Sequence, residues 1–324
     1  FKSIDYPIAP KEYFASEESY KDLVAQEDLD LIYVETPQYW HAEMACAAME
    51  AGKHVATEVP MAYTLADCWQ IIETSERTKK HCATLENCCY DFFEATTINM
   101  ALQGVFGEIV HGAGAYIHHF KTADVFQEPM PPLSKKAGMY RHAVGNSVPG
   151  NRYPTHGFGP VCTAMKINAG DRPVFLTSVE TADFTRGPEF SEILAQGGEY
   201  HKQFKDVEFG GNVNICLVKT ARGKSIQIEY DRDTPRPYSR IHRLCGVNGF
   251  AQKYPIEQIQ LGDELLSDER LAEIQEEYAP ELTKFLRENA VKFGGHGGMD
   301  FIVDYRLVDC LRNGLPLDIT AYED

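Results

Sequence analysis

The sequence has little positive charge and no long apolar run. Its 324 residues include 31 Lys and Arg against 48 Asp and Glu, which gives a formal net charge of −17. A surface this acidic repels phosphate backbones and anionic lipid headgroups, so we expect no nucleic-acid partner. No stretch approaches the roughly 18 consecutive apolar residues of a membrane-spanning helix, so we expect no membrane span.

The nine cysteines form no pattern typical of zinc ligands or disulfides. No two of them have the Cys-x-x-Cys spacing of a zinc site, so we expect mostly reduced, buried thiols. His118 and His119 are adjacent, but neighbouring residues of a strand point to opposite faces, so one ion does not readily bind both. We therefore predict no metal site.

Three familiar catalytic signatures are also missing. The chain has no Gly-x-Ser-x-Gly nucleophile elbow, and its many acidic residues single out no pair of catalytic carboxylates. A Gly-x-Gly-x-x-Gly phosphate loop is absent as well. Because the chain starts at Phe1 without an initiator Met or a signal peptide, we expect it to be part of a longer protein.

Strand and helix signals alternate in the first 90 residues. Three short apolar runs predict buried strands, and the two stretches between them predict helices. The strands are expected at 29–35, 54–57 and 82–85, and the helices at 39–51 and 64–79. This order is typical of a parallel sheet with crossover helices, so we expect α/β architecture in which residues 1–90 form the second half of a Rossmann-like domain.

The second predicted helix has a capping box, formed by Thr64 and Asp67. Its apolar residues Leu65, Cys68, Trp69 and Ile72 recur at helical spacing. We expect these four side chains to face the core.

From residue 91 on, strand signals dominate. Several stretches alternate apolar and polar residues, which is typical of a half-exposed antiparallel sheet. They are expected at 109–117, 175–184, 213–221, 225–230 and 240–245. Residues 91–324 are therefore predicted to form an α+β substrate and oligomerisation domain with a large open, mainly antiparallel sheet. A final helix at 299–313 can pack back on the first domain.

Polar residues follow all three predicted strands of the first domain. Residues 36–41 (Thr-Pro-Gln-Tyr-Trp-His) follow the first strand, Glu58 follows the second, and Glu86 and Asn87 follow the third. The carboxyl ends of parallel strands line the ligand crevice of such folds. A carboxylate and an amide there can hold the hydroxyls and carboxamide of a nicotinamide ribose, although a strand-to-helix turn with Pro is common in itself.

Thr-Pro-x-x-x-His at 36–41, followed by Glu-x-Pro at 58–60, resembles the Gfo/Idh/MocA superfamily of oxidoreductases. Three further motifs are more specific: ENCCY at 86–90, GNRYPTHGFGP at 150–160 and GGMDF at 297–301. They are similar to the NAD-dependent α-N-acetylgalactosaminidases of glycoside hydrolase family 109. The resemblance covers nearly the whole chain.

The resemblance implies a Rossmann domain that binds NAD and an open sheet that is often an oligomer face, so we expect a homo-oligomer. It leaves a bacterial periplasmic and a cytoplasmic location both open. The residues expected to contact the cofactor are Thr36, Pro37, Trp40, His41, Glu58, Asn87 and His296.

Two positions depart from the dehydrogenases of the superfamily. These usually have Lys where this chain has Val59, and Asp where it has Arg152, four residues before His156. A valine cannot transfer a proton or hydrogen-bond an alkoxide. Ordinary dehydrogenase chemistry is therefore not expected, and the glycosidase branch shares the Glu-Val-Pro form.

The candidate catalytic residues are His156, Tyr153 and Tyr90. Histidine titrates near neutrality and tyrosine can donate a proton. Without the resemblance, 150–160 also fits a glycine-rich loop with a structural histidine. Arg141, Tyr238 and Glu58 are expected to bind the sugar.

The resemblance implies a retaining α-N-acetylgalactosaminidase whose substrate carries a terminal α-N-acetylgalactosamine. The implied route is oxidation at C3 with NAD, elimination of the aglycone, water addition and re-reduction. One rival is an NAD(P)-dependent sugar dehydrogenase, which would change cofactor absorbance in proportion to sugar. Another is a non-catalytic sugar-binding or oligomeric scaffold.

Overall fold

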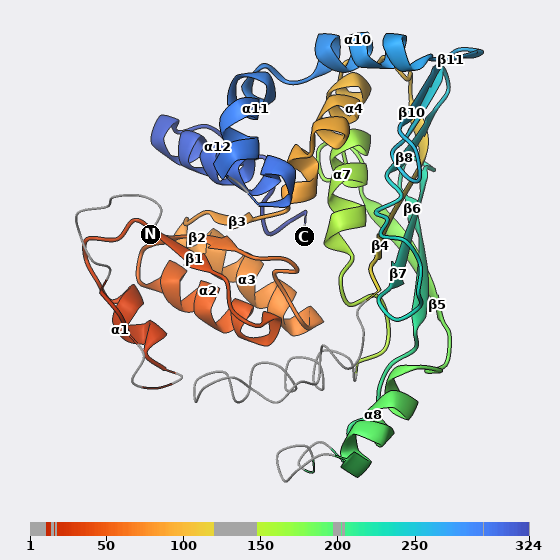
Figure 1. The fold of residues 1–324 in the computed structure, drawn as a ribbon. Coiled ribbons are helices and arrows are strands. Elements are labelled where there is room, and N and C mark those ends of the chain that lie inside the picture. The colour runs from red at the N-terminus through yellow and green to blue at the C-terminus, as the bar shows by residue number, and fades with distance from the viewer. Residues whose placement is uncertain are drawn as a thin grey trace. The chain divides into compact units, whose positions relative to one another are not determined.

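The computed structural model describes residues 11–13, 16, 18–119, 148–196, 202, 205–293 and 295–323. The chain divides into two compact units, Phe1–Thr84 and Leu85–Asp324, and each is described by itself. Figure 1 labels the helices and strands.

The first unit contains the expected parallel sheet, in the order β1-β2-β3. Its helices cross over from one strand to the next, as the alternating signals predicted. The strands are β1 (Leu31–Val34), β2 (His54–Thr57) and β3 (Cys82–Thr84), and the helices are α1 (Tyr20–Val24), η1 (Gln38–Trp40), α2 (His41–Glu50) and α3 (Leu65–Thr78).

The start of α3 is confirmed, but its predicted buried face is wrong. Thr64 accepts from the Asp67 backbone N–H, and the Asp67 carboxylate accepts from the Thr64 backbone N–H. Within this unit Leu65 is 74 % exposed and Trp69 is 59 % exposed, whereas Ile71 is buried. The cap fixes where a helix begins, but packing against α2 selects the face that is buried.

In the described part of the second unit, eight strands form one open sheet, in the order β11-β10-β9-β8-β4-β7-β6-β5. Every neighbouring pair is antiparallel except β4 with β7. The expected fold class is confirmed. The strands are β4 (Ile109–Ile117), β5 (Pro173–Glu180), β6 (Val213–Thr220), β7 (Ser225–Asp231), β8 (Arg243–Gly246), β9 (Gly249–Gln252), β10 (Gln258–Leu261) and β11 (Glu264–Leu265).

Helices α4 and α7 cover one face of this sheet (Figure 1). Their apolar residues form the main core with Ile226 and Ile228 of β7 and Leu244 of β8. The helical elements of the unit are η2 (Asn87–Tyr90), α4 (Phe92–Leu102), α7 (Thr155–Met165), α8 (Arg186–Gln196), α10 (Asp268–Tyr278), α11 (Glu281–Phe293), η3 (His296–Gly298) and α12 (Met299–Asn313).

Two glycines allow α7 to lie directly on β4. A Cβ atom at Gly114 would come within 2.1 Å of the Gly157 carbonyl oxygen, and one at Gly157 within 2.3 Å of the Ala115 nitrogen. Only residues without a side chain permit this approach. The first turn of α7 is thereby held against the carboxyl end of β4, where the candidate site lies.

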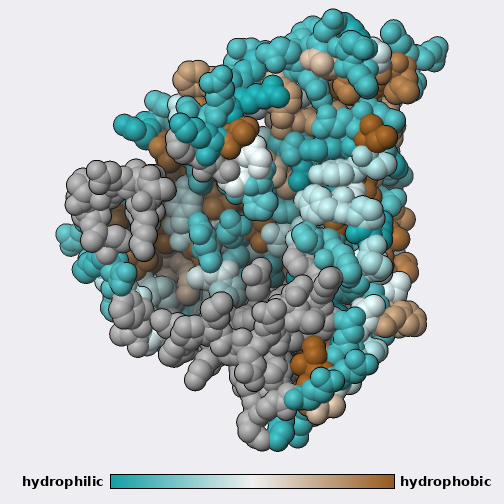
Figure 2. Space-filling model, in the orientation of Figure 1, coloured by the Kyte–Doolittle hydropathy of each residue, from teal (hydrophilic) through white to brown (hydrophobic). Residues whose placement is uncertain are grey.

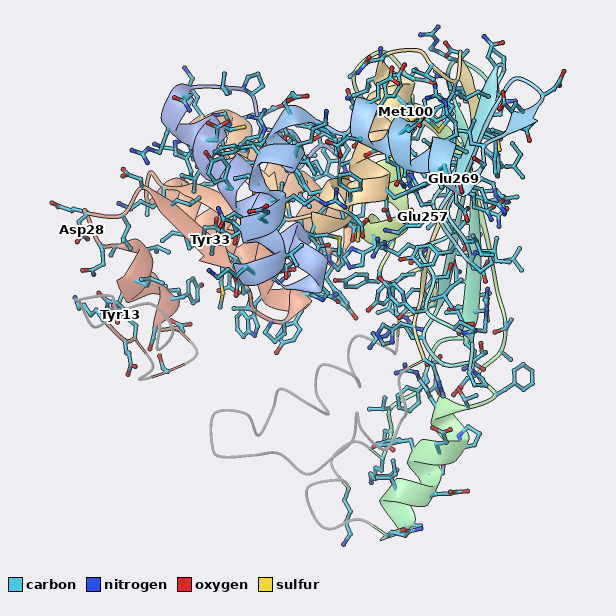
Figure 3. The ribbon with its side chains drawn as sticks, turned by 45° about the horizontal axis from the view of Figure 1, so that its top comes forward. Tyr13, Asp28, Tyr33, Met100, Glu257 and Glu269 are labelled. Carbon is cyan, nitrogen blue, oxygen red and sulfur yellow. The ribbon has the colours of Figure 1, made fainter. Side chains whose placement is uncertain are left out.

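The surface of the described residues is largely polar on the face that Figure 2 shows. In the second unit, Met100 of α4 is fully buried in the same core cluster as Ile274 of α10. Glu257 and Glu269, labelled with Met100 in Figure 3, are exposed. Among the helices that the structure describes, none has the length and apolarity needed to cross a bilayer.

Candidate active site

The candidate site of the second unit centres on a buried carboxylate and a histidine. The Glu86 side chain is 1 % exposed, and His156 in the first turn of α7 is 14 % exposed. Nδ1 of His156 lies 2.9 Å from Oε1 and 3.0 Å from Oε2 of Glu86. Since an ionised carboxylate only accepts hydrogen bonds, His156 donates from Nδ1. In the neutral ring Nε2 then carries the lone pair and is available as a base.

The surroundings of Glu86 keep it ionised. Burial by itself raises the pKa of this carboxyl group, but the charge and hydrogen bond of His156 and the Cys88 backbone N–H outweigh burial and lower it. The Cys88 N–H donates to Oε1 over 3.0 Å. Gly159 of α7 makes room, because a Cβ there would lie 2.8 Å from the Glu86 Cγ. The sequence indicated Glu86 only as a polar group after a strand, and its partner is 70 residues away.

Tyrosine rings flank His156, which brings the two predicted residues Tyr153 and His156 together. The ring centroid of Tyr153 lies 5.0 Å from that of His156, and the Tyr116 centroid lies 5.4 Å from it. Tyr116 and Tyr153 are themselves 4.6 Å apart. Tyr116 was not identified from the sequence. The available signal was strand alternation, which places it on the same face of β4 as Gly114.

A row of rings continues from this cluster to Tyr238, the predicted sugar contact. His118 lies 6.0 Å from Tyr116, and Tyr238 lies 5.4 Å from His118. Tyr254 follows at 6.0 Å from Tyr238. His118 therefore belongs to an aromatic row that starts beside the Glu86–His156 pair.

An ion cluster contacts the Tyr238 and Tyr254 end of this row through Arg240 and Lys253. Arg240 and Lys253 both contact Asp91 and Glu94, so two cations face two carboxylates. The charges of Lys253 and Arg240 outweigh the effect of burial on Asp91 and lower its pKa to about 2. Burial dominates at Glu94, whose pKa is raised to about 7. Tyr238 joins the cluster because Arg240 donates to its hydroxyl over 3.1 Å.

Glu86, Cys88 and His156 also lie close enough together to bind one metal ion. Ligand atoms of Glu86, Cys88 and His156 all lie within 4.8 Å of one another. The hydrogen bonds between Glu86 and His156 already account for both groups. Burial also raises the pKa of the Cys88 thiol well above its ordinary value, which disfavours the thiolate that metals bind. The arrangement therefore favours a hydrogen-bonded pair.

The third predicted catalytic residue, Tyr90, is engaged elsewhere. Its hydroxyl donates to Asp318 over 3.0 Å, and Asp318 also accepts from Arg306. Burial and Asp318 together raise the Tyr90 pKa well above its ordinary value. These contacts tie η2 to the end of the chain and make Tyr90 a poor proton donor.

Asn87 and His296, both expected at the cofactor, are linked through Asp300. The Asn87 amide donates to Asp300 Oδ1 over 2.7 Å, and His296 Nδ1 lies 2.8 Å from Asp300 Oδ2. The His296 side chain is 70 % exposed. At Gly298 the backbone has φ +107°, and a Cβ there would lie 2.8 Å from the Ala290 backbone. The glycines therefore fix the turn that presents His296.

In the first unit, the predicted residues gather at the carboxyl ends of β1 and β2. His41 is 1 % exposed, and its ring nitrogens lie 2.9 Å from the Pro60 carbonyl and 2.7 Å from the Thr36 carbonyl. His41 thus holds two strand-end turns together. Trp40 is the last residue of η1, which begins directly after Pro37. Glu58 accepts from the Val59 N–H over 3.2 Å. Arg141 lies outside the described residues.

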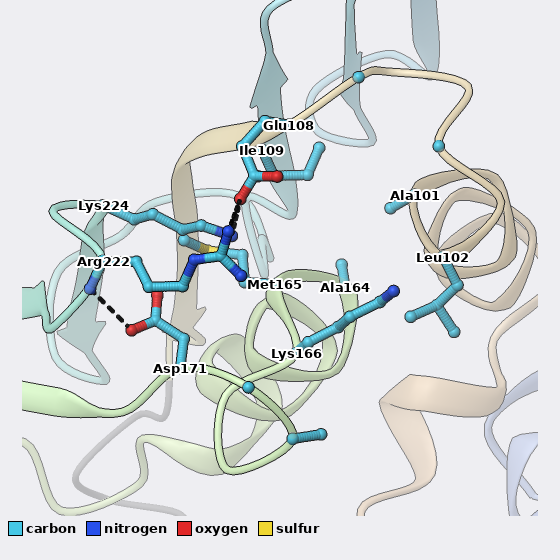
Figure 4. Close-up of a pocket in the computed structure, with 14 residues that line it drawn as sticks. Ala101, Leu102, Glu108, Ile109, Ala164, Met165, Lys166, Asp171, Arg222 and Lys224 are labelled. Carbon is cyan, nitrogen blue, oxygen red and sulfur yellow. Dashed lines mark hydrogen bonds and ion pairs between the residues drawn. The ribbon is translucent and has the colours of Figure 1, made fainter.

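A separate cavity of about 260 Å³ opens at the other end of α7 (Figure 4). Lys224 binds Glu108 over 2.7 Å, and Asp171 accepts from the Arg222 backbone N–H over 3.0 Å. Three cationic side chains line the cavity, those of Lys166, Arg222 and Lys224. They are matched by these two carboxylates and by the C-terminal ends of α4 and α7, where the helix dipoles have their negative ends. The charges balance, so the cavity has no clear preference for an anion, and none of the predicted site residues lines it.

The fold resembles solved oxidoreductases. An inositol dehydrogenase homolog from Azotobacter vinelandii, complexed with NADH and myo-inositol, superimposes with a TM-score of 0.60 at 15 % identity, over 94 % of this chain and 74 % of that one. The aldose-aldose oxidoreductase from Caulobacter crescentus gives 0.60 at 18 % identity, over 95 % and 76 %. At these identities the likeness shows the fold alone.

Sequence comparisons are more specific. "Glycosyl hydrolase family 109 protein 1" of Bacteroides fragilis is 42 % identical over 328 residues, which cover 96 % of this chain and 67 % of that protein. A B. fragilis protein named "Alpha-N-acetylgalactosaminidase" is 40 % identical over 317 residues, covering 96 % and 72 %.

Two family models divide the chain between them. The model of the oxidoreductase family with an NAD-binding Rossmann fold matches residues 7–85, and that of the glycosyl hydrolase 109 C-terminal domain matches 90–324. Both parts of the resemblance seen in the motifs are confirmed. The chain therefore belongs to glycoside hydrolase family 109, with a Gfo/Idh/MocA-type Rossmann domain before its family-specific domain.

Proposed function

We propose that this protein is a retaining α-N-acetylgalactosaminidase that works through NAD-dependent oxidation at C3, elimination, water addition and re-reduction. The observation that carries the proposal is the Glu86–His156 pair beside Tyr153 and Tyr116, in a chain of family 109. The relative named for this activity, at 40 % identity, supports the choice of substrate.

The strand ends of the first unit fit a nicotinamide ribose. The hydroxyls of Thr36 and Thr57 are buried and have no hydrogen-bond partner among the described residues. Buried polar atoms are normally satisfied, so a bound polar group is expected there. We propose that Thr36, Pro37, Trp40 and Glu58 hold NAD with Asn87 and His296, while His41 positions the two turns. Bound NAD would supply the acceptor for a hydride from C3 of the sugar and, as NADH, the donor that returns it, so no net oxidation occurs.

His156 and Tyr153 exchange protons with the substrate in this proposal. His156 accepts through Nε2 because its Nδ1–H is held by Glu86, and the ionised Glu86 stabilises the ring when it becomes charged. The protons moved are those of the C3 hydroxyl and of C2. Once C3 is a ketone, the neighbouring C2 hydrogen is acidic enough for a neutral base. Loss of that proton expels the aglycone from C1, and water then adds to C1.

This route removes the need for two groups that the sequence lacks. Elimination beside a ketone requires no pair of carboxylates across the glycosidic bond. It also agrees with Val59, which cannot assist a dehydrogenase reaction by proton transfer. Tyr238, Arg141 and Glu58 are proposed to bind the sugar.

We also propose that the protein is a homo-oligomer that associates through the outer face of its open sheet. Phe175 and Val179 of β5 and Leu217 of β6 are 62 %, 72 % and 48 % exposed in the isolated chain. Exposed apolar patches of this kind are typical of association sites. Light scattering of the purified protein should give a multiple of the chain mass, and replacing Val179 and Leu217 with Asp should reduce it.

The test of the activity uses an aryl α-N-acetylgalactosaminide and the full-length protein with NAD. We expect release of the aglycone without net formation of NADH. A sugar dehydrogenase would instead form NADH in proportion to the sugar consumed. Tyr153→Phe and His156→Ala should each lower kcat at least a hundredfold while the protein remains folded. Near-full turnover in both variants would remove the assignment.

A further inference from the structure

The hydroxyl of Tyr238 has a fixed cationic donor. Nη1 of Arg240 lies 3.1 Å from Tyr238 Oη, and the two groups are separated by one residue in a loop beside β4. Tyr238 is 41 % exposed, whereas Arg240 is 4 % exposed. The phenol therefore reaches the surface while its partner lies in the interior.

The guanidinium of Arg240 is locked in one orientation. Its Nε and Nη2 atoms donate to Glu94 Oε1 over 3.2 and 2.6 Å, and Nη2 also donates to Asp91 over 2.9 Å. Lys253 lies 2.5 Å from Asp91 and 2.7 Å from Glu94, so both cations contact both acidic side chains. Because the guanidinium is planar, two fixed nitrogens determine where Nη1 points.

This geometry sets the polarity of the Tyr238 hydroxyl. A guanidinium has no acceptor, so Tyr238 Oη must accept from Arg240. Its own hydrogen is then free to point away from the cluster. A hydroxyl that accepts from a cation is also polarised and becomes a stronger donor.

We propose that Arg240 is a positioning residue that makes Tyr238 a hydrogen-bond donor to an acceptor oxygen of the N-acetylated sugar. The inference rests on the proposed function, in which Tyr238 binds the sugar. Arg240 itself does not touch the substrate. The row of rings through His118 and Tyr116 connects Tyr238 to the Glu86–His156 pair.

A double-mutant cycle separates this role from a structural one. Arg240→Lys keeps a positive charge beside Glu94 and Asp91, but a single ammonium cannot reproduce the fork that reaches Tyr238. We expect Tyr238→Phe to lower kcat/KM roughly tenfold, chiefly through KM, and Arg240→Lys to lower it roughly fivefold. In the Tyr238→Phe background, Arg240→Lys should change kcat/KM less than twofold, since the coupled bond is already gone.

The matched control is Arg243→Lys. Arg243 lies on β8 and donates to Gln252 over 2.7 Å, outside this cluster. It should change kcat/KM by the same small factor in both backgrounds. If Arg240→Lys also acts equally in both backgrounds, Arg240 has only a structural role and the inference is wrong.

A second readout does not depend on hydrolysis. The charged and titratable groups that act on Tyr238 are Arg240, Tyr254, Cys88 and Glu94, and the His118 ring packs against it. Burial raises the Tyr238 pKa above its ordinary value, and the charge and hydrogen bond of Arg240 offset part of that rise. In protein with carbon-13 at the tyrosine Cζ, the signal absent from Tyr238→Phe should titrate at higher pH in Arg240→Lys than in the wild type. An unchanged midpoint overturns the inference.

If Arg240→Lys does not fold, the wild type and Tyr238→Phe decide the question. The Nη1 protons of Arg240 should exchange with solvent faster in Tyr238→Phe, and equal exchange overturns the inference. These spectra still report on the pair if the enzyme hydrolyses a different glycoside. Failure of the proposed function and failure of the inference are therefore distinguishable.

Discussion

Replacing Glu86 with Gln tests the centre of the candidate site. Gln has nearly the same shape and can still accept the Cys88 N–H, so the fold should change little. What is lost is the ionised partner of His156, which lies 2.9 Å from Nδ1 in a nearly dry environment. A hydrogen bond to a charged group contributes about 2 kcal/mol, and tenfold in rate corresponds to about 1.4 kcal/mol. We therefore expect kcat to fall roughly 30-fold.

The loss should appear in kcat, because Glu86 acts through His156 during proton transfer. The assay is steady-state hydrolysis of the aryl glycoside, with thermal unfolding measured on the same samples. Glu108→Gln is the control, since Glu108 is a surface partner of Lys224 in the other cavity. A kcat within twofold of the wild type in a folded Glu86→Gln variant would refute the role given to the pair.

Three further predictions concern the support of the site. Asp91→Asn keeps the helix cap but loses a carboxylate whose pKa is lowered to about 2. Such a group stabilises the fold fully above its unfolded pKa, near 3.9, and this stabilisation is lost as the pH falls through 2. In urea unfolding, the variant should therefore have a free energy of unfolding about 2.5 kcal/mol below that of the wild type at pH 7, and about half of that difference should remain at pH 3. Gly159→Ala places a Cβ 2.8 Å from the Glu86 Cγ and should displace the Glu86 carboxylate from His156, so kcat should fall about tenfold or more. An unchanged kcat would show that α7 shifts and leaves the pair intact. Asp300→Asn weakens the link between Asn87 and His296, so the NAD concentration that half-restores activity to stripped enzyme should rise several-fold, whereas Asp309→Asn on the same helix should not change it.

Local patterns predicted the elements well. The strands at 54–57 and 109–117 and the helix at 299–313 agree with β2, β4 and α12 residue for residue. Alternation of apolar residues and terminating glycines are local signals, so one sequence suffices to read them. The buried face of α3 failed because it depends on the partner helix.

The candidate site was predicted only in part for the same reason. His156 and Tyr153 lie in one motif, and Tyr238 was singled out as a candidate sugar contact. The pairing of Glu86 with His156 and the place of Tyr116 beside it were missed, because they arise from contacts between residues about 70 and 40 positions apart. The ion cluster was also invisible, since Glu94 and Arg240 are 146 residues apart.

The isotope content of the released sugar tests the central claim most directly. Hydrolysis of the aryl α-N-acetylgalactosaminide is carried out in heavy water, and the product is examined by NMR at its second carbon. A route through a ketone at C3 removes the hydrogen at C2 and returns one from solvent, so deuterium should appear there at a level that follows turnover. Released sugar that keeps its original hydrogen at C2 would contradict the account.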